Sequence, residues 1–133
     1  MPVTPPEGKD RGYPGRHFTL LVSGPPYGRE AASLAYLFAR EAWAGKCPVD
    51  AVFFYEDGVL NALKTVSPAS DEADLPALWR ELSRDTGMRL VLCSAAGERR
   101  GAVAGSVAPD FEIGALSDLA DLLLTGSRLV QFR

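Results

Sequence analysis

Two cysteines, Cys47 and Cys93, carry the strongest nucleophilic potential in this 133-residue chain. Cys93 ends an apolar run and is followed by small residues, which leave room for a substrate or another sulfur. If a helix begins directly after it, the unpaired N–H groups of the first turn favour the thiolate, the form that attacks sulfur. Cys47 precedes an apolar run and so lies at the amino end of a predicted strand. That end of a strand seldom carries sites in α/β sheets. Cys93 is therefore the candidate nucleophile, and we expect its thiol to be accessible.

The residues after Cys93 also allow other interpretations. Free cysteine behaves as a small hydrophobe, so Cys93 could simply be a buried strand residue. Five residues separate Cys93 from Arg99, the spacing at which cysteine phosphatases and some rhodanese-type loops hold an oxyanion with backbone N–H groups and the arginine. Against this, Ala95 and Ala96 favour a helix over a tight phosphate loop. A phosphatase or oxyanion reductase using Cys93 and Arg99 is thus the weaker alternative, because the pattern is common by chance.

Composition excludes several classes of protein. The net charge of −3 disfavours direct binding of nucleic acid, and no apolar stretch is long enough to span a membrane. With one histidine and no close cysteine pair, no metal site is expected, and no cofactor is implied. Residues 1–16 hold four prolines and no apolar core of a secretory signal, so we expect a flexible leader and a cytoplasmic protein without a disulfide. His17, which borders this leader, is expected to be exposed.

Apolar runs alternate with helical periodicity along the rest of the chain. Helices are predicted around 31–42, 75–82 and 116–125, with a short helix or loop at 59–66. Strands are predicted at 18–22, 49–55, 90–93, 111–113 and 129–132. Strands that are apolar throughout and alternate with helices indicate a mainly parallel sheet covered on both faces. We therefore expect one α/β domain at 17–133, a three-layer α/β/α sandwich with four or five strands, whose reactive groups lie at the carboxyl ends of the strands.

The helix predicted at 116–125 is apolar around most of its circumference. A surface helix of such a sandwich needs only one apolar stripe, so a second apolar face predicts contact with another chain. The residues concerned are Leu116, Leu119, Ala120, Leu122, Leu123 and Leu124.

Several segments, taken in order, resemble the DsrE/TusD family. They are SGPPYG at 23–28, VFFYEDGVLNA at 52–62, SPASDE at 67–72, Cys93 with the alanines at 95–96 and RRG at 99–101, and RLVQF at 128–132. The resemblance covers the chain from about residue 18 to 132. It departs from the family between 101 and 111, where family members carry a longer segment beside the cysteine.

The resemblance implies a sulfurtransferase subunit whose cysteine, Cys93, accepts sulfane sulfur as a persulfide and passes it on. It also implies assembly with homologous subunits, often as a hexamer, and exchange of sulfur with small donor and acceptor carrier proteins. One branch of the family feeds tRNA 2-thiolation and another serves sulfur oxidation. A subunit that only scaffolds an active homologue is the alternative within the family.

Five further residues are candidates for the site beside Cys93. Arg99 and Arg100 could add positive potential near the thiolate. Tyr27, Asn61 and Ser67 lie in segments that match the family and belong to loops at the same edge of the expected sheet. We expect these five side chains to support the thiolate or to line a pocket.

Overall fold

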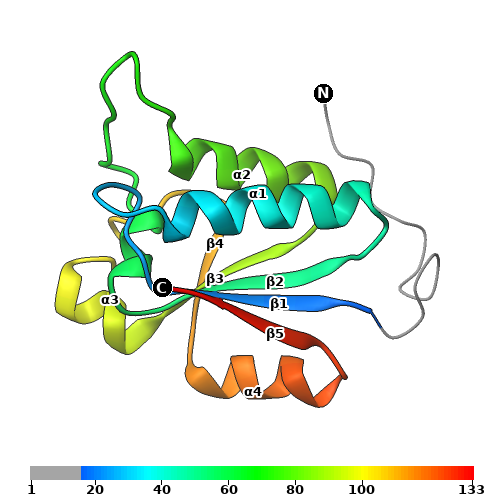
Figure 1. The fold of residues 1–133 in the computed structure, drawn as a ribbon. Coiled ribbons are helices and arrows are strands. Elements are labelled where there is room, and N and C mark those ends of the chain that lie inside the picture. Colours follow the sequence, from blue (N-terminus) through cyan, green and yellow to red (C-terminus); the bar gives the residue numbers. More distant parts are fainter. Residues whose placement is uncertain (1–15) are drawn as a thin grey trace.

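A computed structural model describes residues 16–133, so the predicted leader falls outside the described residues except for Arg16 (Figure 1). Five strands form the sheet: β1 (Phe18–Val22), β2 (Val49–Phe54), β3 (Arg89–Cys93), β4 (Phe111–Gly114) and β5 (Arg128–Phe132). The helical elements are α1 (Ala31–Ala44), the 3-10 helix η1 (Glu56–Ala62), α2 (Leu75–Thr86), α3 (Ser94–Arg100) and α4 (Leu116–Leu124). Each predicted strand and helix is present to within a few residues, and the first half of the segment predicted as a helix or loop at 59–66 belongs to the 3-10 helix.

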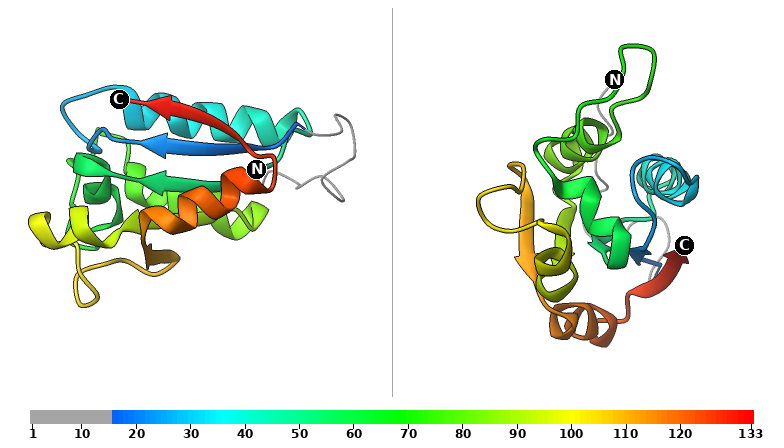
Figure 2. Two further views of the ribbon diagram at one scale, coloured as in Figure 1. Left: turned by 90° about the horizontal axis from the view of Figure 1, so that it is seen from below. Right: turned by 90° about the vertical axis from the view of Figure 1, so that its left-hand side faces the viewer.

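The sheet has the strand order β4-β3-β2-β1-β5, and every neighbouring pair is parallel. Helices α1 and α2 cover one face, whereas α4 crosses the other (Figures 1 and 2). Because all strands run the same way, their carboxyl ends share one edge, where η1 and α3 follow β2 and β3. The predicted three-layer α/β/α fold with a parallel sheet is confirmed.

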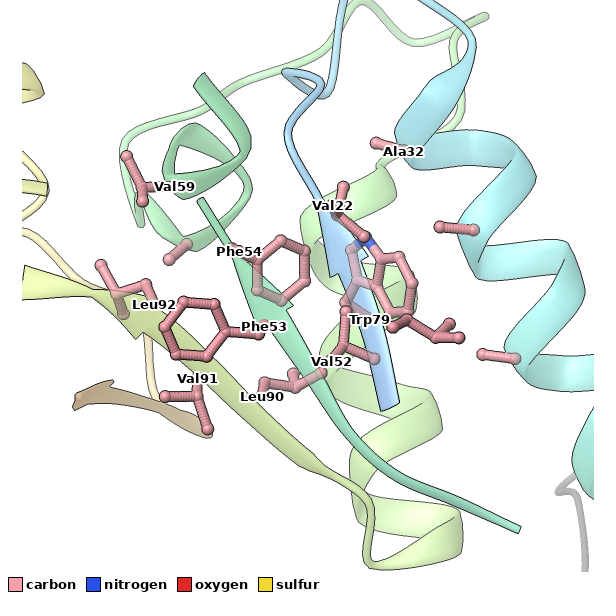
Figure 3. Close-up of a cluster of buried hydrophobic side chains, with 14 of the residues drawn as sticks. Val22, Ala32, Val52, Phe53, Phe54, Val59, Trp79, Leu90, Val91 and Leu92 are labelled. Atoms are coloured by element: carbon pink, nitrogen blue, oxygen red, sulfur yellow. The ribbon is translucent and has the colours of Figure 1, made fainter. Parts of the chain in front are cut away.

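The central strands are buried on both sides, as their continuous apolar sequences require. Figure 3 shows Phe54 and Trp79 among the packed side chains between the sheet and its helices. The Trp79 ring is fully buried and meets the rings of Phe54 and Tyr36 edge-on, with centroids 5.4 and 5.5 Å apart. Such aromatic contacts add to the large apolar area that each ring removes from water. The packing fixes α2 against β2 and α1.

Helix α2 has clear signals at both ends. The Asp74 side chain accepts a hydrogen bond from the Ala77 N–H at 3.2 Å, which satisfies one of the free donors of the first turn. Gly87 follows the helix with a φ of 78°, a left-handed conformation that glycine adopts at little cost. The helix therefore ends at Thr86, and β3, whose last residue is Cys93, begins at Arg89.

Two residues of η1, Gly58 and Asn61, make the contacts between the carboxyl ends of β1 and β2. The Asn61 amide is fully buried and donates to the Gly24 carbonyl at 3.1 Å and to the Gly58 carbonyl at 2.9 Å. Gly58 lies so close to β1 that an added Cβ would stand 2.0 Å from the Val22 carbonyl oxygen. These contacts hold the loop after β1 against the segment after β2.

No helix among residues 16–133 has the length and apolar character needed to cross a membrane. Within the same residues, no cluster of three or more His, Cys, Asp or Glu side chains is arranged to hold a metal ion.

Candidate functional site

Cys93 lies where β3 ends and α3 begins. Its backbone is still extended, with φ −67° and ψ 123°, and Ser94 is already the first residue of the helix. The alternation of side chains along β3 puts Cys93 on the same face as Val91, the face crossed by α4. A helix therefore does begin directly after Cys93, at the carboxyl edge of the sheet.

The Cys93 side chain is only 4% exposed, so the expected accessible thiol is wrong for this conformation. The reason is that Cys93 belongs to the buried hydrophobic core, together with Ala96 of α3 and Ala102 just after that helix. Opposite Cys93, Gly114 of β4 is packed so tightly that an added Cβ would stand 2.8 Å from Cγ1 of Val91. Cys93 is thus a thiol enclosed near the surface, and both cysteines are free of disulfides.

The two candidate arginines differ in their contacts. Arg100 Nε donates to Oδ1 of Asp57 at 2.8 Å, and its Nη1 donates to the Ala96 carbonyl at 3.1 Å. This side chain therefore ties α3 to η1. Arg99 is exposed and makes no hydrogen bond or ion pair with any other residue in the described part of the chain. Neither arginine forms a hydrogen bond to Cys93.

Tyr27, Asn61 and Ser67 do not gather around Cys93. Asn61 is the buried clamp of η1, and Ser67 is an exposed residue of the loop before α2. Tyr27 lines a groove of about 380 Å³ between α1 and α2, together with Leu75. We expect all three residues in loops at the same edge of the sheet. The loops take different paths there, so the three side chains lie apart.

The electrostatic surroundings of Tyr27 reflect the acidic start of α2. Partial desolvation, and then the carboxylates of Asp74 and Glu72, raise the pKa of the Tyr27 phenol above its ordinary value. The groove therefore combines apolar walls with a negative rim, an environment unlike the one that a thiolate needs.

A polar hollow at the same edge was missed from the sequence. It occupies about 290 Å³ at the ends of β1, β2 and β5 and is lined by Ser23, Arg29, Glu56, Asp57, Arg100 and Arg133. Arg29 and Arg133 lie far apart in the chain and neither belongs to a motif. Only the strand order, with β5 beside β1, brings them together.

Comparison of the amino-acid sequence with those of known proteins identifies relatives of this chain. Proteins named Sulfurtransferase TusD from Erwinia tasmaniensis and Proteus mirabilis are 43% and 44% identical to the chain over 126 residues. These alignments cover 86% of this chain and 98% and 97% of the two relatives. A third protein of that name, from Cronobacter sakazakii, is 40% identical over the same length, with 86% of this chain and 98% of the relative covered.

Solved structures share the fold at lower identity. The ychN protein from E. coli is 22% identical with a TM-score of 0.70, over 87% of this chain and 99% of its own. A protein of unknown function from Methanobacterium thermoautotrophicum is 14% identical with a TM-score of 0.70, over 86% of this chain and 97% of its own. At the level of sequence, the model of the DsrE/DsrF-like family matches residues 16–132, which is nearly every residue of the sheet and its helices. The chain therefore belongs to the DsrE/DsrF-like family.

Proposed function

We propose that this chain is a sulfurtransferase subunit that carries sulfane sulfur as a persulfide on Cys93. Two findings support the proposal: the family to which the chain belongs, and relatives named Sulfurtransferase TusD that align over nearly their whole length. The observation that carries the assignment to Cys93 is its place at the carboxyl end of β3 and the start of α3. Reactive groups of parallel α/β sheets collect at this edge. Cys47 lies at the opposite edge, just before β2.

The reaction is an exchange between a thiolate and a polarised sulfur–sulfur bond. The Cys93 thiolate attacks the outer sulfur of a donor persulfide, a new S–S bond forms on Cys93, and the donor thiolate leaves with the electron pair of the broken bond. In the second half, a thiolate of the acceptor carrier attacks the outer sulfur of the Cys93 persulfide, and Cys93 leaves as the thiolate. No net oxidant or reductant is consumed, because the sulfur stays at the same oxidation level throughout.

The burial of Cys93 fits a carrier that must hold a labile group. A persulfide enclosed by α3 is shielded from small thiols that would reduce it in the cytoplasm, where we place the relay. Transfer then requires that a partner or a local opening of α3 expose the sulfur, since exchange needs direct access to it. We propose that donor and acceptor carrier proteins provide this access, in a relay for tRNA thiolation or sulfur oxidation.

Assembly with homologous subunits is part of the same proposal. No side chain of α4 is buried, and several of its leucines are exposed, which supports a second face covered by another chain. The chain would then act within a homo- or hetero-oligomer. If such an assembly carries its sulfur on another subunit, this chain is a scaffold, and the experiment below distinguishes the two roles.

The phosphatase alternative receives little support. In the Cys-x5-Arg enzymes the residues after the cysteine curve around an oxyanion so that their N–H groups point at it. Here the same residues form the α-helix from Ser94 to Arg100, and the Arg99 side chain is exposed. We therefore expect no hydrolysis of a generic aryl phosphate.

Intact-mass spectrometry after exposure to a sulfane-sulfur donor tests the proposal directly. The wild-type chain should gain one sulfur, about 32 Da, that a reductant removes, because thiolate attack forms a reducible S–S bond. The Cys93→Ser variant should gain none, and Cys47→Ser, the matched control, should load like the wild type. Equal loading of the Cys93→Ser variant would refute the assignment. Loading of a co-purified homologous subunit, with none on Cys93, would establish the scaffold role.

A further inference from the structure

The polar hollow at the carboxyl edge is built by segments from four parts of the chain. Ser23 follows β1, Asp57 lies in the first turn of η1, Arg100 ends α3 and Arg133 follows β5. Figures 1 and 2 show the carboxyl end of β5 beside the loop that follows β1. With Arg29 and Glu56, these residues enclose about 290 Å³. The hollow is large enough for a small polyatomic ion, and Cys93 is not among the residues that line it.

Only one of the three arginines that line the hollow is paired with a carboxylate in the described residues. Arg100 is neutralised by its ion pair with Asp57, 2.8 Å away. Arg29 and Arg133, in contrast, form no ion pair or hydrogen bond with the other residues that the structure describes. Counting side chains alone, three arginines and two carboxylates leave the lining with one net positive charge. Two arginines of this lining thus have no partner among the described residues.

Ser23 provides an independent sign that a polar group binds here. The residue is 9% exposed, and its Oγ is buried with no hydrogen-bond partner. A buried hydroxyl without a partner is costly and uncommon in folded proteins, so each instance requires an explanation. An acceptor atom bound in the hollow would satisfy this donor.

We propose that the hollow is a binding site for a small oxyanion of the sulfate, thiosulfate or phosphate type. Guanidinium groups match the geometry of such anions and can donate two parallel hydrogen bonds to them. Arg29 and Arg133 supply the charge, and the Ser23 hydroxyl donates to an oxygen of the anion. Glu56, which also lines the hollow, opposes the binding of large or highly charged anions.

The site goes beyond the proposed sulfur transfer and does not depend on it. It lies at the same edge of the sheet as Cys93, but Arg29 and Arg133 are separate from the thiol. The same chemistry is carried by free inorganic anions and by the phosphate group of a larger molecule. A comparison of inorganic anions with a phosphomonoester such as glycerol phosphate distinguishes these two sources.

Isothermal titration calorimetry at constant ionic strength, with chloride as the balancing salt, tests the site. Sulfate, thiosulfate, phosphate and glycerol phosphate are titrated separately into the purified chain. At least one should bind saturably with a stoichiometry of one per chain. Arg29→Ala and Arg133→Ala should each weaken this binding by about tenfold or more, since a hydrogen bond to a charged group is lost. Ser23→Ala, which removes a neutral donor, should weaken it by less than either arginine substitution.

Two control variants keep this test specific. Arg40→Ala removes an exposed arginine of α1 outside the hollow and should leave the affinity unchanged. Cys93→Ser should also bind the anion normally, so failure of the sulfur-transfer proposal and failure of the anion site are distinguishable. Circular dichroism of each variant verifies that it is folded. The absence of saturable binding for all four anions overturns the proposal, as does equal weakening by Arg40→Ala, which would indicate unspecific attraction.

Discussion

At the scale of single residues, the two cysteines differ in their access to reagents. Cys93 is almost completely buried, whereas Cys47 is partly exposed and its Sγ lies 3.8 Å from the Gly45 carbonyl oxygen. In the isolated chain, a maleimide carrying a polyethylene glycol chain should therefore label Cys47 at least about tenfold faster than Cys93, because Cys93 reacts only after local opening. Iodoacetamide, a much smaller reagent, should reduce the ratio of the two labelling rates. Mass spectrometry of the labelled chain over time measures both rates.

Single-cysteine variants make this comparison clean. Cys47→Ser reports on Cys93 alone, and Cys93→Ser reports on Cys47 alone. Labelling in denaturant gives the rate without protection. If the bulky reagent labels Cys93 in the native chain as fast as it does in denaturant, the strand end is open in solution and the protection proposed for the persulfide is absent. Faster labelling of Cys93 in the presence of a partner carrier would indicate that the partner opens α3.

The site could be predicted from sequence only in part, and single residues show why. Cys93 was found because an apolar strand ends there, which is a local signal. The contact of Arg100 with Asp57 spans 43 positions, so it has no local signature. His17 is a second case: it is buried against the carboxylate of Asp50, although its position beside the leader predicted exposure.

At the scale of elements, the position of η1 depends on one glycine. The Cβ of an alanine at position 58 would stand 2.0 Å from the Val22 carbonyl oxygen, so backbone must move to accept it. We expect Gly58→Ala to lower the free energy of unfolding by at least about 2 kcal/mol, since overpacking a rigid contact strains the backbone. Urea unfolding followed by the fluorescence of the two buried tryptophans, Trp43 and Trp79, measures the change.

Gly105→Ala is the matched control for this substitution. No atom lies within 4 Å of a Cβ at Gly105, and its φ is not in the left-handed region. The control should therefore change the free energy of unfolding by less than about 0.5 kcal/mol, within the range of surface substitutions. Equal stability of the two variants would show that the contact between η1 and β1 can relax without cost.

The elements themselves were largely readable from the sequence. Periodic apolar residues identify α1 and α2, and continuous apolar runs identify β1, β2 and β3, because these signals come from neighbouring residues. The sequence predicts only a helix or loop at 59–66, because η1 shows no apolar periodicity. Its conformation is set instead by the Asn61 hydrogen bonds to Gly24 and Gly58, and a contact of 37 positions cannot be seen locally.

At the scale of the whole molecule, the two faces of the sheet are unequally covered. Helices α1 and α2 pack side by side on one face, whereas α4 crosses the other, with the short α3 near its carboxyl edge (Figure 2). Every residue of α4 remains at least partly exposed, although the helix is rich in leucine. Leu124 is 84% exposed and Leu116 is 51% exposed, and Leu129 of β5 adds to this surface. We call these three side chains the α4 surface.

If the α4 surface is buried against another subunit, a charged side chain introduced there should weaken the assembly. Leu116→Glu and Leu124→Glu should each weaken association by about 100-fold or more, because an unpaired carboxylate would be buried at the contact. Leu37→Glu, an equally exposed leucine on α1, is the control and should leave association unchanged. Light scattering with size-exclusion chromatography measures the mass of the isolated chain and of the set co-expressed with homologous subunits. Loss of assembly in the Leu37→Glu variant instead would move the contact to the face of α1. A wild-type chain that stays monomeric in both preparations contradicts the assembly, and with it the proposed place of this chain in a multisubunit sulfur relay.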